Sequence, residues 1–375
     1  MDASNLHSLA LLRKGQGRVV VKVGTSSLTD TAGRIDEQRV AALGRGIAAI
    51  EQATGLVPVI VSSGAGAAGR GRLGLQLPLT LPEKQAAAAV GQTLLMTHWQ
   101  RALEPEPVAQ LLLSAGDVHD RERYVNAKHA LHASLKAGAI PIINENDSVA
   151  TAELKLGDND TLSAWVAYLV DASLLIILTD VDGLYDADPR KHPDAKLRAV
   201  IDDLDEAQAS VDDGHGAHGT GGMLTKLKAA AIAKGAGIPT LIMGGGGEGL
   251  VTLANGKAKG TFVPVPQDRA QARKAWLAQQ PVQGRITIDA GAALALQDGK
   301  SLLPRGITRV EGAFAFGDAV EVATEEGQVI ARGLTNYAST SLATIAGRHS
   351  REIAELLGSK DFDEAIHRDN LTLRK

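Results

Sequence analysis

Short, continuously apolar runs recur along the first two thirds of the chain and alternate with longer segments of helical spacing. The runs lack regular polar positions, which is typical of strands buried on both faces of a sheet. Strands that alternate with helices favour right-handed crossovers on a parallel sheet. The predicted strands cover 18–23, 56–62, 108–113, 139–143, 174–179 and 238–243, and the predicted helices cover 36–53, 83–103, 121–136, 161–170 and 224–234. We therefore expect an α/β fold, a three-layer αβα sandwich around a mostly parallel sheet.

The pattern changes after Pro264. A polar stretch leads to Pro281, and beyond it short β-like runs are separated by glycine turns, which predicts a small β-rich barrel with a helix or two. These runs are 284–288, 310–316, 319–323 and 329–333. We expect a first domain at 15–265, a linker at 266–281 and a second domain at 282–360.

Composition narrows the classes of function. The formal net charge is -4, which gives no general attraction to nucleic acid or to anionic lipid. There are no cysteines, so disulfides, thiolate metal sites and cysteine nucleophiles are excluded. The longest apolar run, 165–179, is interrupted by Asp171 and Ser173, and the amino terminus lacks the charge order of a secretory signal. We expect no membrane span and a cytoplasmic location.

Lys22 ends the first predicted strand and is followed by Gly24, Thr25 and Ser26. A glycine at this position lets backbone N–H groups approach an anion beside the lysine ammonium, which is typical of a phosphate site. The alternative is a lysine at a strand end whose side chain extends to solvent.

A second glycine-rich segment comes directly before a predicted helix. Thr220, Gly221 and Gly222 lie at its start, where free N–H groups and the helix dipole attract anions, and Lys226 follows about one turn inside. An ordinary loop before a basic surface helix is the alternative. Two lysines at one site would neutralise the charge of a triphosphate, since phosphoryl transfer depends mainly on positioning and charge neutralisation.

Amides and carboxylates crowd the end of one strand and the start of the next helix. Capping explains at least one of them, but their number exceeds what a cap requires, and the carboxyl ends of parallel strands are where open α/β sheets bind ligands. Asp160 could orient the two lysines, while Asp147 and Asn159 could receive an ammonium. The cluster consists of Asn144, Asn146, Asp147, Asp158, Asn159 and Asp160.

Two further signals concern nucleotides. Thr179 and Asp180 follow a buried strand, and we interpret their loop as one that faces a nucleotide, with a plain turn as the alternative. The spacing 64–66–69 matches G-x-G-x-x-G, but the helix that should follow is interrupted by glycines and Pro78, so a nicotinamide enzyme is not expected. A Walker motif is absent.

Five ordered motifs together resemble the amino-acid kinase family, and within it the members that phosphorylate glutamate. The tail, with GAALAL, SLLPRGI and VEGAFAFGDAV, is similar to the PUA domain that many bacterial members carry. The resemblance covers nearly the whole chain from about Arg18. The motifs are VVVKVGTSSL, VIVSSGAGAAGRGRLG, INENDSVATAELKLGDND, LTDVDGLYDADPR and GTGGMLTKLKAA.

The resemblance implies transfer of the γ-phosphate of ATP, accompanied by Mg²⁺, to the side-chain carboxylate of L-glutamate in the first step of proline biosynthesis. It also implies feedback inhibition by proline, a homo-oligomer (dimer or tetramer) and a possible transient contact with the downstream glutamyl phosphate reductase. Asp160 matches the carboxylate that organises the two lysines. The ATP positions are Lys22, Thr179, Asp180, Thr220, Gly221, Gly222, Met223, Leu224, Thr225 and Lys226, and the glutamate positions are Ser63, Asp147, Asn159 and Asn144.

One departure and two alternatives remain open. Gly66 stands where relatives usually carry a bulky aliphatic residue, which leaves the shape of the acceptor pocket undecided. Another substrate of the same fold (aspartate, N-acetylglutamate or a nucleoside monophosphate) is the first alternative, and RNA binding by the tail is the second. The tail from Val282 carries 11 Lys and Arg against 13 Asp and Glu, so it lacks a basic footprint and we do not expect RNA binding.

Overall fold

The chain folds into two compact units, and the main boundary between them falls between Val265 and Pro266. The computed structural model describes residues 17–30, 34–114, 117, 121–149, 158–187, 189, 191–212, 222–257, 259–265, 277, 282–358, 360 and 362–374. Apart from Leu277, the predicted linker at 266–281 lies outside the described residues.

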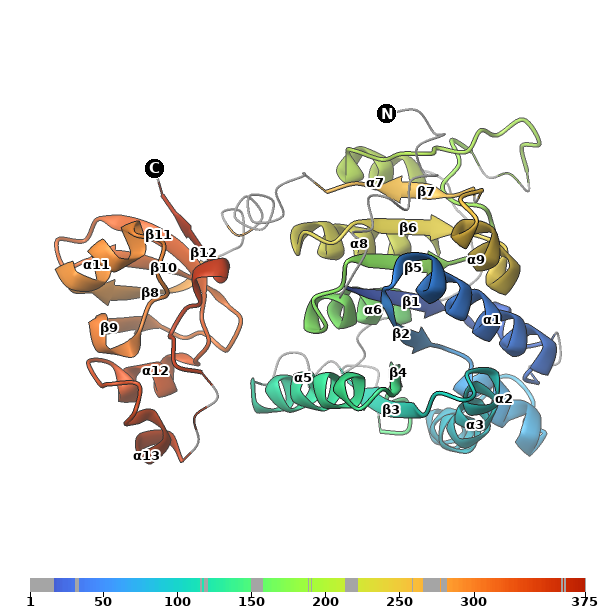
Figure 1. Ribbon diagram of the computed structural model, residues 1–375, viewed down its shortest axis with the longest axis horizontal. Coiled ribbons are helices and arrows are strands. Elements are labelled where there is room, and N and C mark those ends of the chain that lie inside the picture. Colours follow the sequence, from blue (N-terminus) through green and yellow to red (C-terminus); the bar gives the residue numbers. More distant parts are fainter. Residues whose placement is uncertain are drawn as a thin grey trace. The chain divides into compact units, whose positions relative to one another are not determined.

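A seven-stranded sheet forms the centre of the first unit, in the order β3-β4-β2-β1-β5-β6-β7 (Figure 1). Every pair of neighbours is parallel except β6 and β7, which are antiparallel. The strands are β1 (Arg18–Val23), β2 (Val57–Ser62), β3 (Val108–Leu113), β4 (Ile140–Glu145), β5 (Leu174–Leu178), β6 (Thr240–Met243) and β7 (Thr261–Val263). The six predicted strands and the mostly parallel sheet are confirmed, whereas β7 was not predicted because three residues are too few to show a pattern.

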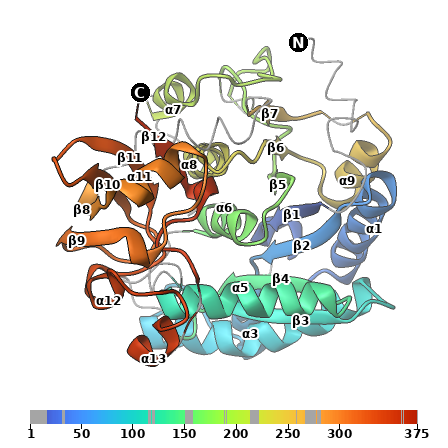
Figure 2. The ribbon, with the colours of Figure 1, turned by 60° about the vertical axis from the view of Figure 1, so that its left-hand side comes forward.

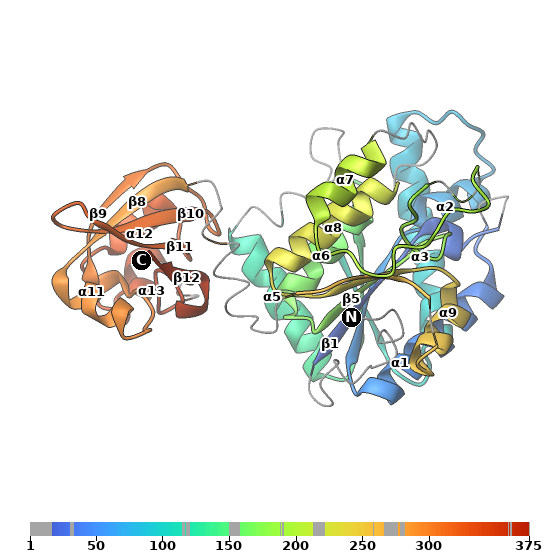
Figure 3. The same cartoon turned by 90° about the horizontal axis from the view of Figure 1, so that it is seen from above.

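Helices cover both faces of this sheet, so the predicted three-layer sandwich is confirmed. Helices α6 and α8 lie side by side on one face, and α1 and α9 lie together on the other (Figures 1 and 3). The helices are α1 (Glu37–Thr54), α2 (Ala65–Leu73), α3 (Leu81–Ala102), α5 (Arg121–Lys136), α6 (Asn159–Leu169), α7 (Leu204–Asp212), α8 (Met223–Gly235) and α9 (Gly246–Ala254).

The alternation of side chains along β1 explains how a lysine comes to lie inside this layered structure. Val19, Val21 and Val23 belong to the apolar core that also contains residues of α1, α3 and α9. Because successive side chains of a strand point to opposite faces, Lys22 points to the other face, where α6 and α8 lie. The fold therefore directs this lysine toward two helix amino termini.

Helix α2 corrects one expectation, because the sequence analysis treated the segment after Gly64 as interrupted by glycines. The helix runs through Gly69 and Gly71 and packs closely on α3, although it does end at its C-cap Gly74. A Cβ on Gly69 would lie 1.7 Å from the carbonyl oxygen of Ala87, and one on Gly91 would lie 1.7 Å from that of Ala65. These glycines permit close packing of two helices, and this packing offsets their low helix propensity.

Two glycines of α2 give a matched pair of opposite predictions. A Cβ on Gly66 would meet nothing within 4 Å, so Gly66→Ala should stabilise the protein by roughly 0.5–1 kcal/mol, since alanine favours a helix more than glycine does. Gly69→Ala should instead destabilise it by about 1–3 kcal/mol through overpacking. Urea denaturation of both variants would measure the difference, and a loss of stability in Gly66→Ala would contradict the open space seen at that position.

The second unit contains a five-stranded sheet in the order β12-β11-β10-β8-β9. Its own apolar core includes Tyr337, Val320 and Ile286, so the predicted β-rich second unit is confirmed. Figure 2 shows helices α12 and α13 next to each other beside β9. The elements are β8 (Val282–Ile288), α11 (Ala290–Gln297), β9 (Ile307–Gly312), β10 (Ala319–Thr324), β11 (Val329–Leu334), α12 (Ser339–Ile345), α13 (Ile353–Leu357) and β12 (Leu371–Leu373).

Strand β12 pairs with β11 and lies beyond residue 360, where the sequence analysis placed the end of the second domain. A three-residue strand near a chain end carries no periodic signal, so the sheet extends further than the sequence pattern indicates. Among the described residues, no helix is both long enough and apolar enough to cross a membrane.

Candidate functional site

The carboxyl ends of four neighbouring strands bring the predicted site residues to one edge of the first sheet. Strand β1 lies between β2 and β5, so the chain builds the sheet on one side of β1 with β2 to β4 and on the other side with β5 to β7. Ligands of open α/β sheets bind outside the carboxyl ends of the strands at such a point. Residues after β1, β2, β4 and β5 therefore share one rim.

A buried carboxylate holds two lysines at this rim. The Nζ atom of Lys22 lies 2.6 Å from Oδ1 of Asp160, and Nζ of Lys226 lies 3.1 Å from Oδ2. All three residues are buried, with Asp160 only 1% exposed. The hydroxyl of Thr225 also donates to Oδ2 of Asp160 at 2.7 Å. The structure thus brings together the three predicted catalytic residues.

Each member of this cluster is placed by a different element. Lys22 is the fifth residue of the central strand β1, and Lys226 lies about one turn inside α8. Asp160 lies in the first turn of α6, whose dipole favours a negative charge there. Asp158 caps this helix by accepting from the N–H of Thr161 at 2.7 Å, so it is the capping residue expected in this acidic segment.

Burial and the opposed charges shift the pKa values within the cluster. Burial lowers the pKa of Lys22 below its usual value, and the attraction of Asp160 offsets only part of that effect, because Lys226 lowers the pKa further. Burial by itself would raise the pKa of Asp160, but the attraction of Lys22 and Lys226 outweighs it, so this pKa lies below its usual value. Asp160 is therefore ionised at neutral pH, and with both lysines protonated the cluster carries one net positive charge.

The predicted acceptor-binding residues form a chain of side-chain hydrogen bonds beside this cluster. Nδ2 of Asn159 donates to Oγ of Ser63 at 2.7 Å and to Oδ1 of Asn144 at 3.0 Å. Nδ2 of Asn144 in turn donates to Oε1 of Gln92 at 3.0 Å. Gln92 was not predicted as a site residue, although a glutamine within the alanine-rich stretch KQAAAAVGQ of α3 was a usable signal.

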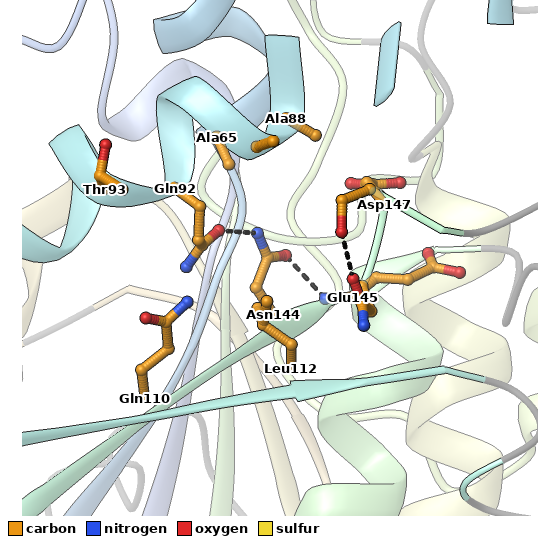
Figure 4. A pocket seen from close by; sticks show the side chains of 12 residues that line it. Ala65, Ala88, Gln92, Thr93, Gln110, Leu112, Asn144, Glu145 and Asp147 are labelled. Atoms are coloured by element: carbon orange, nitrogen blue, oxygen red, sulfur yellow. Dashed lines mark hydrogen bonds between the residues drawn. The ribbon is translucent and has the colours of Figure 1, made fainter. Parts of the chain in front are cut away.

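A cavity of about 210 Å³ opens between α3 and the ends of β3 and β4. Its lining includes Gln92, Gln110, Asn144 and Asp147, whose side chains are seen in Figure 4. A neighbouring cavity of about 340 Å³ is lined by Gly66 and shares Asp147 with the first. Asp147, predicted to bind the acceptor, therefore lies where the two cavities adjoin.

The predicted nucleotide residues lie partly within the described structure. Thr179 and Asp180 follow β5 at the same rim, and the Thr179 hydroxyl donates to Oδ1 of Asp180 at 3.1 Å. Gly222 is exposed and directly precedes Met223 and Leu224 at the start of α8. The remaining two residues of this prediction, Thr220 and Gly221, lie outside the described residues.

Comparison with known proteins identifies the family. A model of the amino acid kinase family matches residues 17–244, which contain every predicted site residue. The chain belongs to the amino acid kinase family. A PUA domain model matches residues 284–357. The chain is accordingly a kinase, and use of ATP follows from its family.

Curated relatives in this family match over nearly their full length. The glutamate 5-kinase of Carboxydothermus hydrogenoformans is 48% identical over 96% of this chain and 98% of its own. The glutamate 5-kinase of Deinococcus radiodurans is 47% identical over 95% and 99%, and that of Moorella thermoacetica is 46% identical over 94% and 95%. Among solved structures, carbamate kinase from Giardia lamblia bound to AMP-PNP is 19% identical and covers 67% of this chain and 99% of its own, with a TM-score of 0.49.

Proposed function

We propose that this kinase is a glutamate 5-kinase, which transfers the γ-phosphate of ATP to the side-chain carboxylate of L-glutamate and gives L-glutamyl 5-phosphate and ADP. The observation that carries the proposal is the pair of buried lysines on one carboxylate. The identity to relatives named glutamate 5-kinase supports this choice of acceptor.

The two lysines address the main barrier to this reaction. A carboxylate that approaches a triphosphate meets like charge, and two unit charges 4 Å apart repel by roughly 4 kcal/mol at an effective dielectric of 20. Lys22 and Lys226 would lie on the transferring phosphoryl group, with Asp160 holding both ammonium groups in place before ATP arrives. Such a preorganised arrangement stabilises developing charge at no cost in reorganisation.

The acceptor would bind on the side of Ser63 and the linked amides. In the proposed arrangement Asp147 and Asn159 receive the ammonium of glutamate, and Ser63 and Asn144 complete the glutamate site. The glutamate carboxylate oxygen then attacks the γ-phosphorus while the bond from this phosphorus to the β,γ-bridging oxygen breaks. The leaving electron pair stays on the oxygen of ADP. The two lysine ammonium groups would stabilise the negative charge that develops on the phosphoryl oxygens.

The nucleotide would lie along the rim between β5 and α8. Thr179, Asp180 and the segment Thr220 to Lys226 are the proposed ATP residues. Mg²⁺ enters the proposal together with ATP, because it is usually held by substrate phosphates, water and one or two carboxylates. Asp180 is an exposed carboxylate at this rim and has the oxygen donors that Mg²⁺ prefers. The ion would neutralise phosphate charge.

The proposal extends to the setting of the enzyme. It places the enzyme in the cytoplasm at the first step of proline biosynthesis, with proline as feedback inhibitor. It also includes a homo-oligomer and a transient contact with the reductase that consumes the product.

Trapping of the product with hydroxylamine tests the choice of acceptor. An acyl phosphate reacts with hydroxylamine to give a hydroxamate, which forms a coloured complex with ferric iron. The protein with ATP, Mg²⁺ and L-glutamate should therefore give hydroxamate that is absent without ATP. The same assay with aspartate and N-acetylglutamate should give little product, and added proline should reduce the signal with glutamate. Hydroxamate with aspartate but not with glutamate would refute the assignment.

A further inference from the structure

The amide chain beside the acceptor site has a fixed direction. Each link is a donor nitrogen that faces an acceptor oxygen, from Asn159 to Asn144 and from Asn144 to Gln92. Oδ1 of Asn144 also accepts from the backbone N–H of Glu145 at 2.9 Å. Turning any one amide over would place two donors or two acceptors against each other, so the orientation of one amide determines the next.

Gln92 is the last residue in this series of amide hydrogen bonds and is poorly suited to a purely structural role. Its side chain is only 8% exposed, and Nε2 is buried with no hydrogen-bond partner in the part of the chain that the structure describes. A buried donor without a partner reduces stability, so an apolar residue of similar volume would suit the helix better. The side-chain hydrogen bond that Gln92 makes among the described residues is the one that its Oε1 accepts from Asn144, visible in Figure 4.

We propose that Gln92 is a positioning residue for binding of the acceptor, which acts by fixing the amide of Asn144 and, through it, that of Asn159. The inference rests on the proposed function, because Asn144 and Asn159 are assigned there to the glutamate site. Gln92 also lines the cavity of about 210 Å³, but its described side-chain hydrogen bond is to Asn144, and we therefore assign it an indirect role through that amide. Without Oε1 of Gln92, the Asn144 amide keeps its bond from the N–H of Glu145 but loses the bond that holds its Nδ2, so its Oδ1 is less firmly placed to accept from Asn159.

A double-mutant cycle with Asn144 tests this coupling. Gln92→Met removes the oxygen at nearly constant volume and should raise the KM for L-glutamate about tenfold, in line with the loss of one oriented hydrogen bond. The KM for ATP should change by less than twofold. Asn144→Ala should have an effect at least as large, and the double variant should match Asn144→Ala within twofold, because Gln92 acts only through Asn144.

Gln100→Met supplies the matched control, since Gln100 lies on the same helix and binds backbone groups instead. Its Nε2 donates to the carbonyl of Glu106 and its Oε1 accepts from the N–H of Val108. This variant should lower the unfolding midpoint and leave the KM for glutamate unchanged. Gln92→Met should instead raise the KM for glutamate and keep the midpoint within about 3 °C of wild type, because removal of the unpartnered Nε2 offsets the loss of the acceptor for Nδ2 of Asn144.

The proposal is overturned if the two single effects multiply in the double variant, or if Gln92→Met lowers stability and leaves the glutamate KM unchanged. Gln92→Leu, measured alongside, removes the same oxygen and must give the same coupling. Failure of the proposed function would look different, because wild type would then make hydroxamate with another acceptor. The cycle would be measured with that acceptor and would still report on Gln92.

Discussion

Lys22→Ala and Lys226→Ala should each lower kcat by about 10²–10³, by analogy with the loss of a single donor from an oxyanion site. Each variant removes one of the two ammonium groups that meet the phosphoryl group, and the remaining one is left to neutralise the charge alone. Because both lysines are buried against Asp160, water does not readily replace the missing cation. The loss should therefore appear in turnover, measured as hydroxamate formed at saturating ATP and glutamate.

Lys228→Ala is the matched control for this pair. Lys228 lies on α8 two residues from Lys226, but its side chain is exposed. The Lys228→Ala variant should have a kcat close to that of wild type. This result would show that the positive charge of α8 in general does not determine turnover. Near-normal turnover in Lys22→Ala or Lys226→Ala would remove that lysine from the mechanism.

Asp160→Asn should reduce the free energy of unfolding by about 3–5 kcal/mol, the range seen when one partner of a buried ion pair is removed. The change leaves Lys22 and Lys226 buried without a negative partner, and the single oxygen of the new amide can accept from only one of them while its NH2 group faces the other. The urea midpoint would report the loss. Asp158→Asn is the control, because asparagine caps a helix as well as aspartate does and should cost less than about 0.5 kcal/mol.

The defect of Asp160→Asn should shrink as the pH rises. The pKa of Lys22 is already lowered by burial in the wild-type protein, and loss of the Asp160 attraction lowers it further. Between this folded pKa and the usual value of 10.5, the unfolded chain binds more protons than the folded chain, so stability increases with pH in that window. A stability difference from wild type that stays constant up to pH 10 would contradict a charge-based cause.

The sequence by itself determined most of the strands of the first sheet and the residue types of an anion site. Continuous apolar runs identified six of the seven strands in the first sheet, because strands buried on both faces need apolar residues at every position. The lysine and glycine at the end of β1 and the glycines before α8 pointed to an anion site, because these residue types favour phosphate in any fold. The acidic segment before α6 pointed to a carboxylate that could orient the lysines. Length and pattern were enough for these predictions, since each depends on residues that are close together in the chain.

The sequence suggested that Asp160 could orient the two lysines, but only the tertiary structure decided which distant residues are in contact. The contact of Lys22 with Asp160, and of Asp160 with Lys226, joins residues that are far apart in sequence, and strand order, which local pattern leaves undetermined, brings them together. The glycines of α2 looked like helix breakers because their packing partner, Gly91, lies in another helix. Gln92 remained hidden for the same reason, since its role depends on Asn144, which the sheet places beside it. The residue types that favour phosphate or a helix cap can be identified from short stretches of sequence. Which charges and amides pair with each other depends on how the helices and strands pack.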